Sequence, residues 1–412
     1  MDTTEKKKSP VGGGGSDSDD AVSFAYDCSL VNYNHNILEA GCQVEMDKVC
    51  LLNTTECVEV VRKFTPKKKF SALLAESYGR LQMETKQQRV SECGSFLEFA
   101  HDYVFYGAIN PQGKLHNANF CRDRLCPMCA WRRSYKIFGQ ISKIMDYIAQ
   151  DYAFLFVTLT VPSVKGDKLS ETIDRMNDAF IRKFMKYSAI KKAVCGFYRA
   201  LEITRQNDKK SKSYGLYHPH FHCVLAVPKS YFKKTGYLKR DEWLEFWQKA
   251  YGDESITQVD VRRAYDKRKS DLVQSDALTS ADAVASLSSA VAEIAKYAVK
   301  LDEDMLLDDE VVKTLSDALY HRRLVSFGGC FKEAYENLGL DDAEEGDLIH
   351  VDDNINASLV QLIVRYGWNC GAYSVIETYL KCSLPSIDIS CSEDSEPLKG
   401  SYSALNERLK AV

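Results

Sequence analysis

Three of the eight histidines in this 412-residue chain lie within five residues, at His218, His220 and His222. The surrounding stretch, YHPHFHCVLAV at residues 217–227, is aromatic and apolar and predicts a strand over His218–Pro228. Side chains alternate between the faces of a strand, so the three imidazoles share one face, with about 7 Å between successive positions. Imidazoles placed in this way can bind one divalent ion. The alternative is a half-buried strand whose histidines face solvent.

The strand before this one contributes a carboxylate. A strand is predicted over Gly196–Arg205, and within it Glu202 stands among apolar residues, where a carboxylate needs a partner. An adjacent antiparallel strand would bring Glu202 beside the histidines. Phosphate chemistry with Mg²⁺ or Mn²⁺ favours an oxygen ligand. Glu202 is therefore a candidate third ligand beside His220 and His222, and His218 is its competitor.

Further strands and helices surround this pair. The run YAFLFVTLTV at residues 152–161 is stopped by Pro162 and predicts a buried strand, and another strand is predicted over Thr257–Arg263. Helices are predicted where apolar residues recur at helical spacing; they cover Trp131–Ile148, Ser170–Lys186, Arg240–Tyr251 and about 280–301. This mixture with short polar connections indicates an α+β domain built around a mostly antiparallel sheet.

A second set of chemically active residues is predicted on the last of these helices. Glu293 and Tyr297 are four residues apart, so they lie on one face of a helix, one turn from each other. A tyrosine can act as a covalent nucleophile when its phenolate is stabilised and its target polarised. A metal ion together with Lys296 or Lys300 would supply both effects. Taken alone, Tyr297 is one of 23 tyrosines, most of which pack a ring and bond a hydroxyl.

Three cysteines, Cys121, Cys126 and Cys129, form a C-x4-C-x2-C pattern with a proline inside the second pair. This spacing suits thiolate binding of zinc, although three structural thiols are the alternative. The candidates for a fourth ligand are His116, which is the nearest, and Cys93 and His101, which are also within reach in sequence. Basic residues around the pattern indicate that it also holds a phosphate backbone; they are Arg122, Arg124, Arg132, Arg133 and Lys136.

In their order along the chain, these features resemble the three motifs of the single-tyrosine rolling-circle replication initiators of small plasmids, in the HUH endonuclease superfamily. The first motif would be Phe156–Thr160, the second His218–His222 and the third Glu293–Tyr297. The stretch Arg323–Lys332 also looks like the segment that closes the domain in that family, so the resemblance covers roughly residues 115–335. It implies an HUH-type central antiparallel sheet of about five strands, with helices on one face and the metal histidines on a central strand.

The resemblance also implies an enzyme, a site-specific DNA endonuclease and strand transferase of the nicking-closing type. His220 and His222, with Glu202 or His218, would hold Mg²⁺ or Mn²⁺ against the scissile phosphate of the plasmid's double-strand origin. Tyr297 would then attack, forming a 5′-phosphotyrosyl link and freeing a 3′-OH that primes host polymerase.

Three further residues have roles in this scheme. Lys300 or Lys296 would stabilise charge in the transition state, and Glu293 would act as general base for a water that cleaves the regenerated origin, before rejoining or termination. Such a site needs single-stranded DNA, so the origin is expected to be extruded as a hairpin or opened by supercoiling. The expected partners are plasmid origin DNA, a host helicase and a host DNA polymerase.

Two other classes of protein fit part of the pattern. One is a non-catalytic, zinc-containing DNA-binding regulator in which Tyr297 is a packing residue; it predicts origin binding without a covalent adduct. The other is a neighbouring HUH enzyme, a relaxase or a single-strand transposase. Relaxases place their tyrosine ahead of the histidine motif, whereas Tyr297 follows His222, and the presence of Glu293 favours the initiator.

Composition divides the chain into five parts. Residues 1–20 form a Gly/Ser/Asp-rich leader that we expect to be disordered, and residues 21–100 have no assigned role. Residues 101–145 form the basic cysteine-bearing segment, which we expect to bind zinc and DNA, and residues 146–340 form the nicking domain. Residues 341–412 are expected to form an acidic, partly disordered extension, in which the apolar stretch 359–366 can make a small docked helix or strand.

The net charge of −4 hides an asymmetry between the two ends of the chain. Residues 301–412 carry nine basic and 22 acidic residues, whereas residues 1–300 carry 45 and 36. We therefore expect the extension to compete with DNA phosphates for the basic surface. The leader has no apolar stretch and no run of about 18 apolar residues occurs, and 14 cysteines are too few for a secreted disulfide scaffold. These features predict a soluble, cytoplasmic protein without a membrane anchor.

Overall fold

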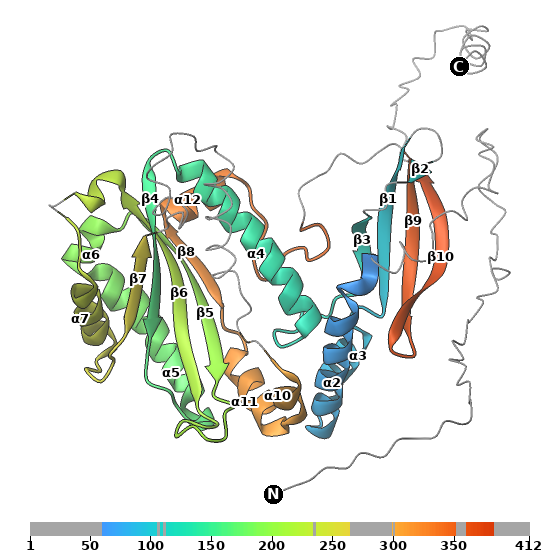
Figure 1. Cartoon of the computed structure of the whole chain (residues 1–412), viewed down its shortest axis with the longest axis horizontal. Coiled ribbons are helices and arrows are strands. Elements are labelled where there is room, and N and C mark those ends of the chain that lie inside the picture. Colours follow the sequence, from blue (N-terminus) through green and yellow to red (C-terminus); the bar gives the residue numbers. More distant parts are fainter. Residues whose placement is uncertain are drawn as a thin grey trace, which may run out of the picture. The chain divides into compact units, whose positions relative to one another are not determined.

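The computed structural model describes residues 60–104, 108–109, 113–233, 236–263, 299, 301–351 and 360–382. All of them belong to the second of two units, which begins at Lys48 (Figure 1). The expected leader at residues 1–20 and the end of the acidic extension after residue 382 lie outside the described residues.

Five strands form the central sheet: β4 (Tyr152–Thr160), β5 (Gly196–Arg205), β6 (Tyr217–Pro228), β7 (Val259–Arg263) and β8 (Val325–Gly329). Their order across the sheet is β7-β4-β6-β5-β8, and every neighbouring pair is antiparallel. β6, which carries the three histidines, is therefore the central strand (Figure 1). The predicted antiparallel sheet is confirmed, and β4 to β7 lie where the sequence placed strands.

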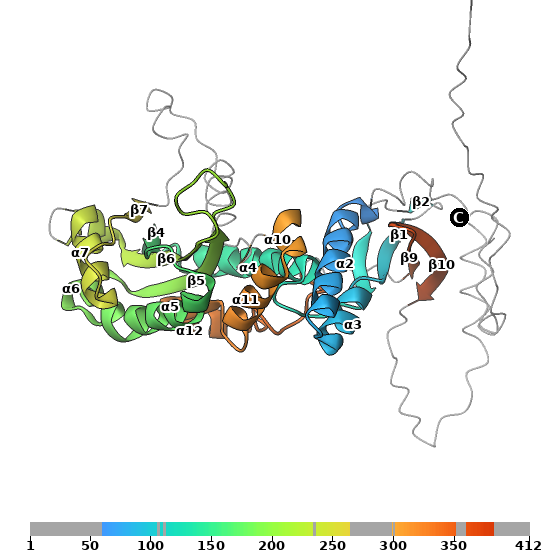
Figure 2. The same ribbon diagram turned by 90° about the horizontal axis from the view of Figure 1, so that it is seen from below.

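The α-helices are α2 (Thr65–Arg80), α3 (Glu84–Glu92), α4 (Pro127–Ile148), α5 (Gly166–Asp178), α6 (Ser188–Ala193), α7 (Arg240–Tyr251), α10 (Glu303–Leu307), α11 (Asp309–Leu319) and α12 (Cys330–Asn337). Shorter helical segments are η2 (Ala179–Lys183), η3 (Phe184–Lys186) and η4 (Lys229–Phe232). α2 lies beside α10 and α11 (Figures 1 and 2), where Arg80 Nε donates to Asp309 Oδ2 at 2.9 Å. The helix predicted at about 280–301 falls almost entirely outside the described residues.

Helices cover both faces of the central sheet, not one face as expected. Ile141 and Ile144 of α4 and Phe331 of α12 pack with Tyr198 and Val224, on the face that also carries the histidines. α5 and α7 contribute to the core on the opposite face (Figure 1). The physical reason is that β5 and β6 are apolar on both faces at the end away from the histidines, and both faces need cover there.

A second sheet joins the two ends of the described chain. Its strands are β1 (Phe96–Val104), β2 (Ala108–Ile109), β3 (Lys114–Ala118), β9 (Val360–Asn369) and β10 (Ala372–Cys382). The order is β10-β9-β1-β2, with β3 also paired to β1, and all pairs are antiparallel. Residues near position 100 therefore fold together with residues more than 250 positions later.

Within the expected acidic extension, the apolar stretch 359–366 is expected to make a small docked helix or strand, and the structure has the strand β9 there, paired with β1. Leu362, Ile363, Val364 and Tyr366 of β9 are buried, and β9 lies between β10 and β1 in the second sheet. The segment 341–351 contacts α4. The expected domain boundaries after residues 100 and 145 likewise fall inside β1 and α4.

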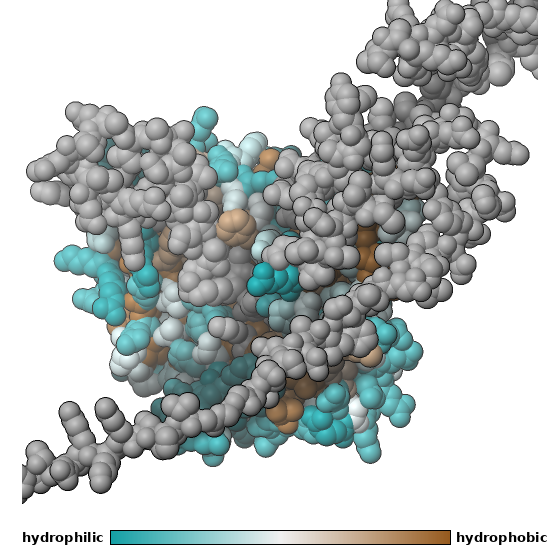
Figure 3. Space-filling model, turned by 45° about the vertical axis from the view of Figure 1, so that its right-hand side comes forward, coloured by the Kyte–Doolittle hydropathy of each residue, from teal (hydrophilic) through white to brown (hydrophobic). Residues whose placement is uncertain are grey.

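On the face seen in Figure 3, hydrophilic side chains predominate and hydrophobic ones form separate small patches. Within the part of the chain that the structure describes, we find no helix with the length and apolar character needed to cross a membrane.

Candidate metal sites

His220, His222 and Glu202, hereafter the histidine group, come together on one face of the central sheet. β5 and β6 pair so that Glu202 lies opposite His220. His222 Nε2 is 2.7 Å from Glu202 Oε2, His220 Nε2 is 3.4 Å from the same oxygen, and the two Nε2 atoms are 3.1 Å apart. Potential ligand atoms of all three residues lie within 4.8 Å of one another. Two imidazoles and one carboxylate at one point form a donor set that can hold a divalent ion.

Hydrogen bonds orient both imidazoles of the histidine group. His220 Nδ1 lies 3.1 Å from the backbone oxygen of His218, so the ring can donate there and present Nε2 to a metal. His222 Nδ1 lies 3.3 Å from Thr158 Oγ1, because β4 pairs with β6 so that Thr158 is opposite His222. Sequence reasoning missed this role of Thr158, although the alternation in Phe156–Thr160 places it on the histidine face.

His218 lies next to the histidine group but is not a member of it. Its Nδ1 is 3.3 Å from Ser163 Oγ, and its ring centroid is 5.4 Å from that of His220. Burial lowers the pKa of His218, and the neighbouring His220 lowers it further, so the imidazole is neutral at pH 7. Of the two competing third ligands, the structure groups Glu202 with the histidines.

Glu202 is held in its charged form. Its burial by itself would raise the pKa, but hydrogen bonds and charge interactions with His220 and His222 outweigh burial and lower the pKa of Glu202 to about 2. The carboxylate is therefore ionised at neutral pH, as a metal ligand must be.

The predicted catalytic residues of the third motif, Glu293, Lys296, Tyr297 and Lys300, lie outside the described residues. The nearest described position is Val299, whose backbone forms a parallel bridge to Ile203. Ile203 follows Glu202 in β5, so the chain passes the strand that carries Glu202 two residues after Tyr297.

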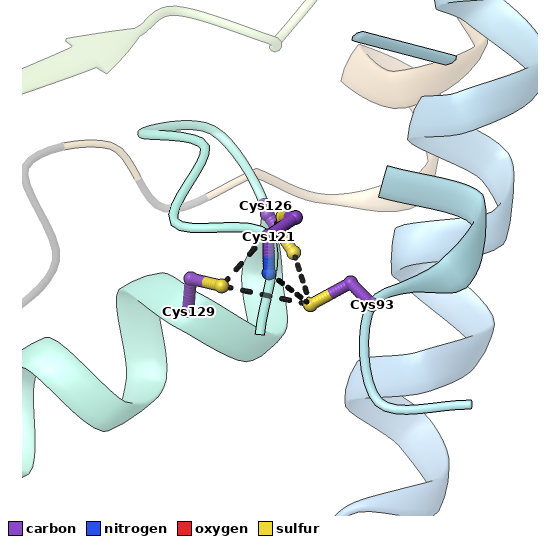
Figure 4. Close-up of side chains that lie close together, drawn as sticks. All are labelled: Cys93, Cys121, Cys126 and Cys129. Atoms are coloured by element: carbon purple, nitrogen blue, oxygen red, sulfur yellow. Dashed lines mark hydrogen bonds between the residues drawn. The ribbon is translucent and has the colours of Figure 1, made fainter. Parts of the chain in front are cut away.

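Four cysteines, hereafter the thiol group, form the second cluster: Cys93, Cys121, Cys126 and Cys129 (Figure 4). Cys93 follows α3, Cys121 and Cys126 belong to the loop before α4, and Cys129 lies in the first turn of α4. All four are buried and none forms a disulfide. The structure thus brings the three cysteines of the C-x4-C-x2-C pattern together and adds a fourth.

Cys93, and not His116, is the fourth member of this group. His116 lies on β3, where its Nε2 is 3.4 Å from Lys381 Nζ of β10 and its ring is 6.5 Å from that of His350. His116 is nearer to the pattern in sequence, but it lies on β3, which pairs with β1 away from the loop. Cys93 follows α3, whose end lies beside the loop. His101, the other candidate, is buried on β1 outside the group.

Two of the arginines predicted to bind DNA are buried under the segment 341–349. Arg132 donates from Nε and a terminal nitrogen to the backbone oxygens of Leu348 and Ile349, both at 2.8 Å. Arg133 donates from Nε to the backbone oxygen of Glu344 at 3.1 Å. Both side chains are less than a tenth exposed, so in this structure they satisfy carbonyl groups of the chain instead of facing a phosphate backbone.

The other two predicted DNA-binding arginines contact the same acidic segment. Arg122 donates to the backbone oxygen of Glu345 at 2.6 Å. Arg124 forms ion pairs with Glu344 and, at 3.2 Å, with Glu345. The segment 341–349 therefore meets these basic residues through individual hydrogen bonds and ion pairs.

Together, the fold and these clusters define an α+β protein with two candidate metal sites, one on the central strand of an antiparallel sheet and one among buried thiols. The model of the family described as Replication protein matches residues 112–374. The chain belongs to this family of replication proteins.

Individual relatives agree. The chain is 38% identical to "Protein rep" of Bacillus amyloliquefaciens over 308 residues. The matched region covers 71% of this chain and 86% of the relative. The chain is 33% identical over 315 residues to "Protein rep" of Streptococcus pneumoniae, covering 75% and 89%, and 37% identical over 256 residues to "Replication protein" of Staphylococcus aureus, covering 60% and 98%. No solved structure matches the chain. The resemblance to replication initiators is thereby confirmed.

Proposed function

We propose that the chain is a plasmid rolling-circle replication initiator that binds the double-strand origin and nicks one strand of it. The observation that carries this proposal is the histidine group, whose ligand atoms lie within 4.8 Å of one another on the central strand and its neighbour. Membership of the family of replication proteins supports the same role.

The histidine group fits a divalent ion by the chemistry of its donors. His220 and His222 turn their Nε2 atoms toward Glu202, which is ionised. Bonds from their Nδ1 atoms, to a backbone oxygen and to Thr158, hold the two rings in this orientation. Mg²⁺ or Mn²⁺ bound there supplies polarisation of a phosphate oxygen.

Tyr297 is the proposed nucleophile. Its oxygen bonds to the scissile phosphorus as the bond to the 3′ oxygen breaks, which leaves a 5′-phosphotyrosyl link and a free 3′-OH. Lys296 or Lys300 offsets the charge that develops, and Glu293 serves as the base for the water that ends the cycle. The bridge between Val299 and the strand of Glu202 supports placing this segment near the histidine group.

The proposed substrate is origin DNA that is single-stranded or extruded as a hairpin at the nick site. A host helicase would extend the opening, and a host DNA polymerase would elongate the 3′-OH. The same reaction run in reverse joins the ends, so the protein is proposed to act as a nicking-closing strand transferase.

The decisive experiment identifies the residue that becomes linked to DNA. Overlapping oligonucleotides that tile the plasmid's origin region are incubated with the protein and Mn²⁺, with EDTA in a parallel sample. We expect cleavage of one oligonucleotide with Mn²⁺ only, and mass spectrometry of the DNA-linked peptide to place the link on Tyr297. Tyr297→Phe should remove both link and cleavage.

Tyr320→Phe is the matched control, because Tyr320 is an exposed tyrosine outside both clusters and its variant should cleave normally. A link to a residue other than Tyr297, or cleavage without any link, would contradict the proposed nucleophile. Origin binding without cleavage would support the non-catalytic regulator instead.

A further inference from the structure

We propose that the thiol group binds one structural Zn²⁺ as four thiolates, with Lys68 as its buried counter-charge, and that this site holds the N-terminal helices, α4 and the C-terminal hairpin together. The proposal concerns a site separate from the histidine group and does not depend on the nicking chemistry. It assigns a role to residues 60–100, which sequence reasoning left without one.

The spacing of the sulfur atoms matches a tetrahedral zinc site. Cys93 Sγ lies 3.5 Å from Cys129 Sγ and 3.6 Å from Cys126 Sγ, and Cys121 Sγ lies 3.7 Å from Cys129 Sγ. Zinc–sulfur bonds of about 2.3 Å in a tetrahedron place sulfur atoms about 3.8 Å apart. A disulfide would require about 2.05 Å. All four cysteines are less than a tenth exposed, which suits a closed structural site with no position left for substrate.

Each sulfur atom is within reach of a hydrogen-bond donor, as thiolates require. The backbone N–H of Cys121 donates to Cys93 Sγ at 3.4 Å, that of Arg122 to Cys129 Sγ at 3.2 Å, and that of Asp123 to Cys121 Sγ at 3.4 Å. Ser71 Oγ lies 3.3 Å from Cys126 Sγ. Such donors stabilise negative charge on sulfur and orient the ligands. The loop is therefore already arranged around four charged sulfurs.

Lys68 is a cation buried beside the thiol group. It comes from α2, is 2% exposed, and donates from Nζ to the backbone oxygens of Ser91 at 2.6 Å and Cys93 at 2.9 Å. Four thiolates and one Zn²⁺ carry a net charge of −2, and a buried charge needs a partner. The ammonium of Lys68, hydrogen-bonded to the backbone oxygen of Cys93, would offset part of this negative charge.

The position of the site explains what it would join. The four cysteines come from the end of α3, the loop between β3 and α4, and the start of α4, and Ser71 and Lys68 come from α2. From β10, Tyr373 Oη donates to the backbone oxygen of Gly94, next to Cys93, at 2.6 Å. Metal binding at this point would stabilise contacts among segments that are far apart in sequence.

Two variants with matched controls test the proposal by metal content. Purified full-length protein is analysed for zinc and iron, and then for Co²⁺ spectra after exchange. Cys93→Ser is compared with Cys370→Ser, an exposed cysteine outside the group, and Lys68→Met with Lys69→Met, an exposed neighbour on the same helix. We expect one zinc per chain, loss of it in Cys93→Ser alone, and a tetrahedral thiolate Co²⁺ spectrum.

Lys68→Met should keep one zinc but lose it to a chelator about 10–100-fold faster than Lys69→Met, the scale of a residue that supports ligands. Iron in place of zinc, full zinc in Cys93→Ser, or equal release from the two lysine variants would each overturn the corresponding part of the proposal. The zinc content of His220→Ala should equal that of the unmodified protein, because His220 belongs to the histidine group. This result is expected whether or not the protein nicks DNA, so it tests the zinc site separately from the proposed function.

Discussion

The histidine group and the thiol group both bring potential metal ligands together, but in different ways. His220, His222 and Glu202 come from two neighbouring strands and meet because strand register places them opposite one another. The thiol group comes from a helix end, a loop and a helix start. Alternation along β6 and its register with the neighbouring strand β5 build the first, whereas the second depends on how separate segments pack.

The two groups also differ in exposure and in their supporting hydrogen bonds. The side chains of His220, His222 and Glu202 are 11–16% exposed, whereas Cys93, Cys126 and Cys129 are fully buried. Side chains and a carbonyl orient the imidazoles, while peptide N–H groups point at sulfur. The greater exposure of the histidine group suits the proposed nicking site, and the burial of the thiol group suits the proposed structural zinc site.

The largest expected effects come from two variants, each of which should disturb only one of the two groups. His220→Ala combined with His222→Ala should lower Mn²⁺-dependent cleavage on the order of 10³-fold, the scale on which loss of charge stabilisation lowers turnover, without changing zinc content. Cys126→Ser should abolish zinc binding and lower the free energy of unfolding by about 3–5 kcal/mol. Cleavage assays, metal analysis and thermal unfolding give the three readouts.

His321→Asn serves as the control for the histidine variant, because His321 is exposed and its positive φ suits asparagine. If the histidine variant lost zinc, or Cys126→Ser kept it, the two groups would not be the separate sites compared above.

The next largest effect concerns the basic residues beside the thiol group. Arg133→Leu should lower the free energy of unfolding by about 3 kcal/mol, because the backbone oxygens of Glu344, Asp123 and Arg122 lose their donor. DNA affinity measured against salt concentration should keep its slope. Arg182→Leu, at a largely exposed residue, is the matched control for stability.

A salt dependence reduced by about one phosphate contact in Arg133→Leu would restore the sequence-based prediction that this residue binds DNA. It would also mean that the segment 341–349 leaves α4 when DNA binds.

The smallest effect is the pH dependence of the histidine group without added Mn²⁺. The pKa of Glu202 falls from an ordinary 4.5 to about 2 on folding, so the unfolded chain binds the proton more tightly. The stability that Glu202 contributes is therefore complete above about pH 4.5 and is lost as pH falls toward 2; it amounts to at most about 3 kcal/mol.

Urea unfolding of the native chain and of Glu202→Gln measures this contribution. The difference in free energy of unfolding between them should shrink from about pH 5 to about pH 3. A constant difference would show that the carboxylate does not form the charged contacts with His220 and His222.

Much of the central sheet was predictable because its signals are local. The apolar run at 152–161 and the histidine stretch at 217–227 each show strand character, and alternation placed the three histidines on one face, whereas the choice between Glu202 and His218 as third ligand needed the register of β5 with β6. Helices on one face were what the family resemblance implied, whereas Val224, on the histidine face of β6, is buried under α4.

Predictions about the thiol group and the C-terminal part succeeded less well for a physical reason. The C-x4-C-x2-C pattern identified three members, but Cys93 and His116 are both near it in sequence, and only chain path separates them. The strand character of 359–366 was visible, yet its partner β1 lies more than 250 residues earlier.

By itself, then, the sequence determined strands β4 to β7, the shared face of His218, His220 and His222, and the motifs of a replication protein, since each depends on periodicity or spacing within a short stretch. Only the tertiary structure decided that Cys93 completes the thiol group, that Lys68 is buried beside it and that the C-terminal strands close the N-terminal sheet. Those outcomes depend on register and packing between distant segments, which no local pattern encodes.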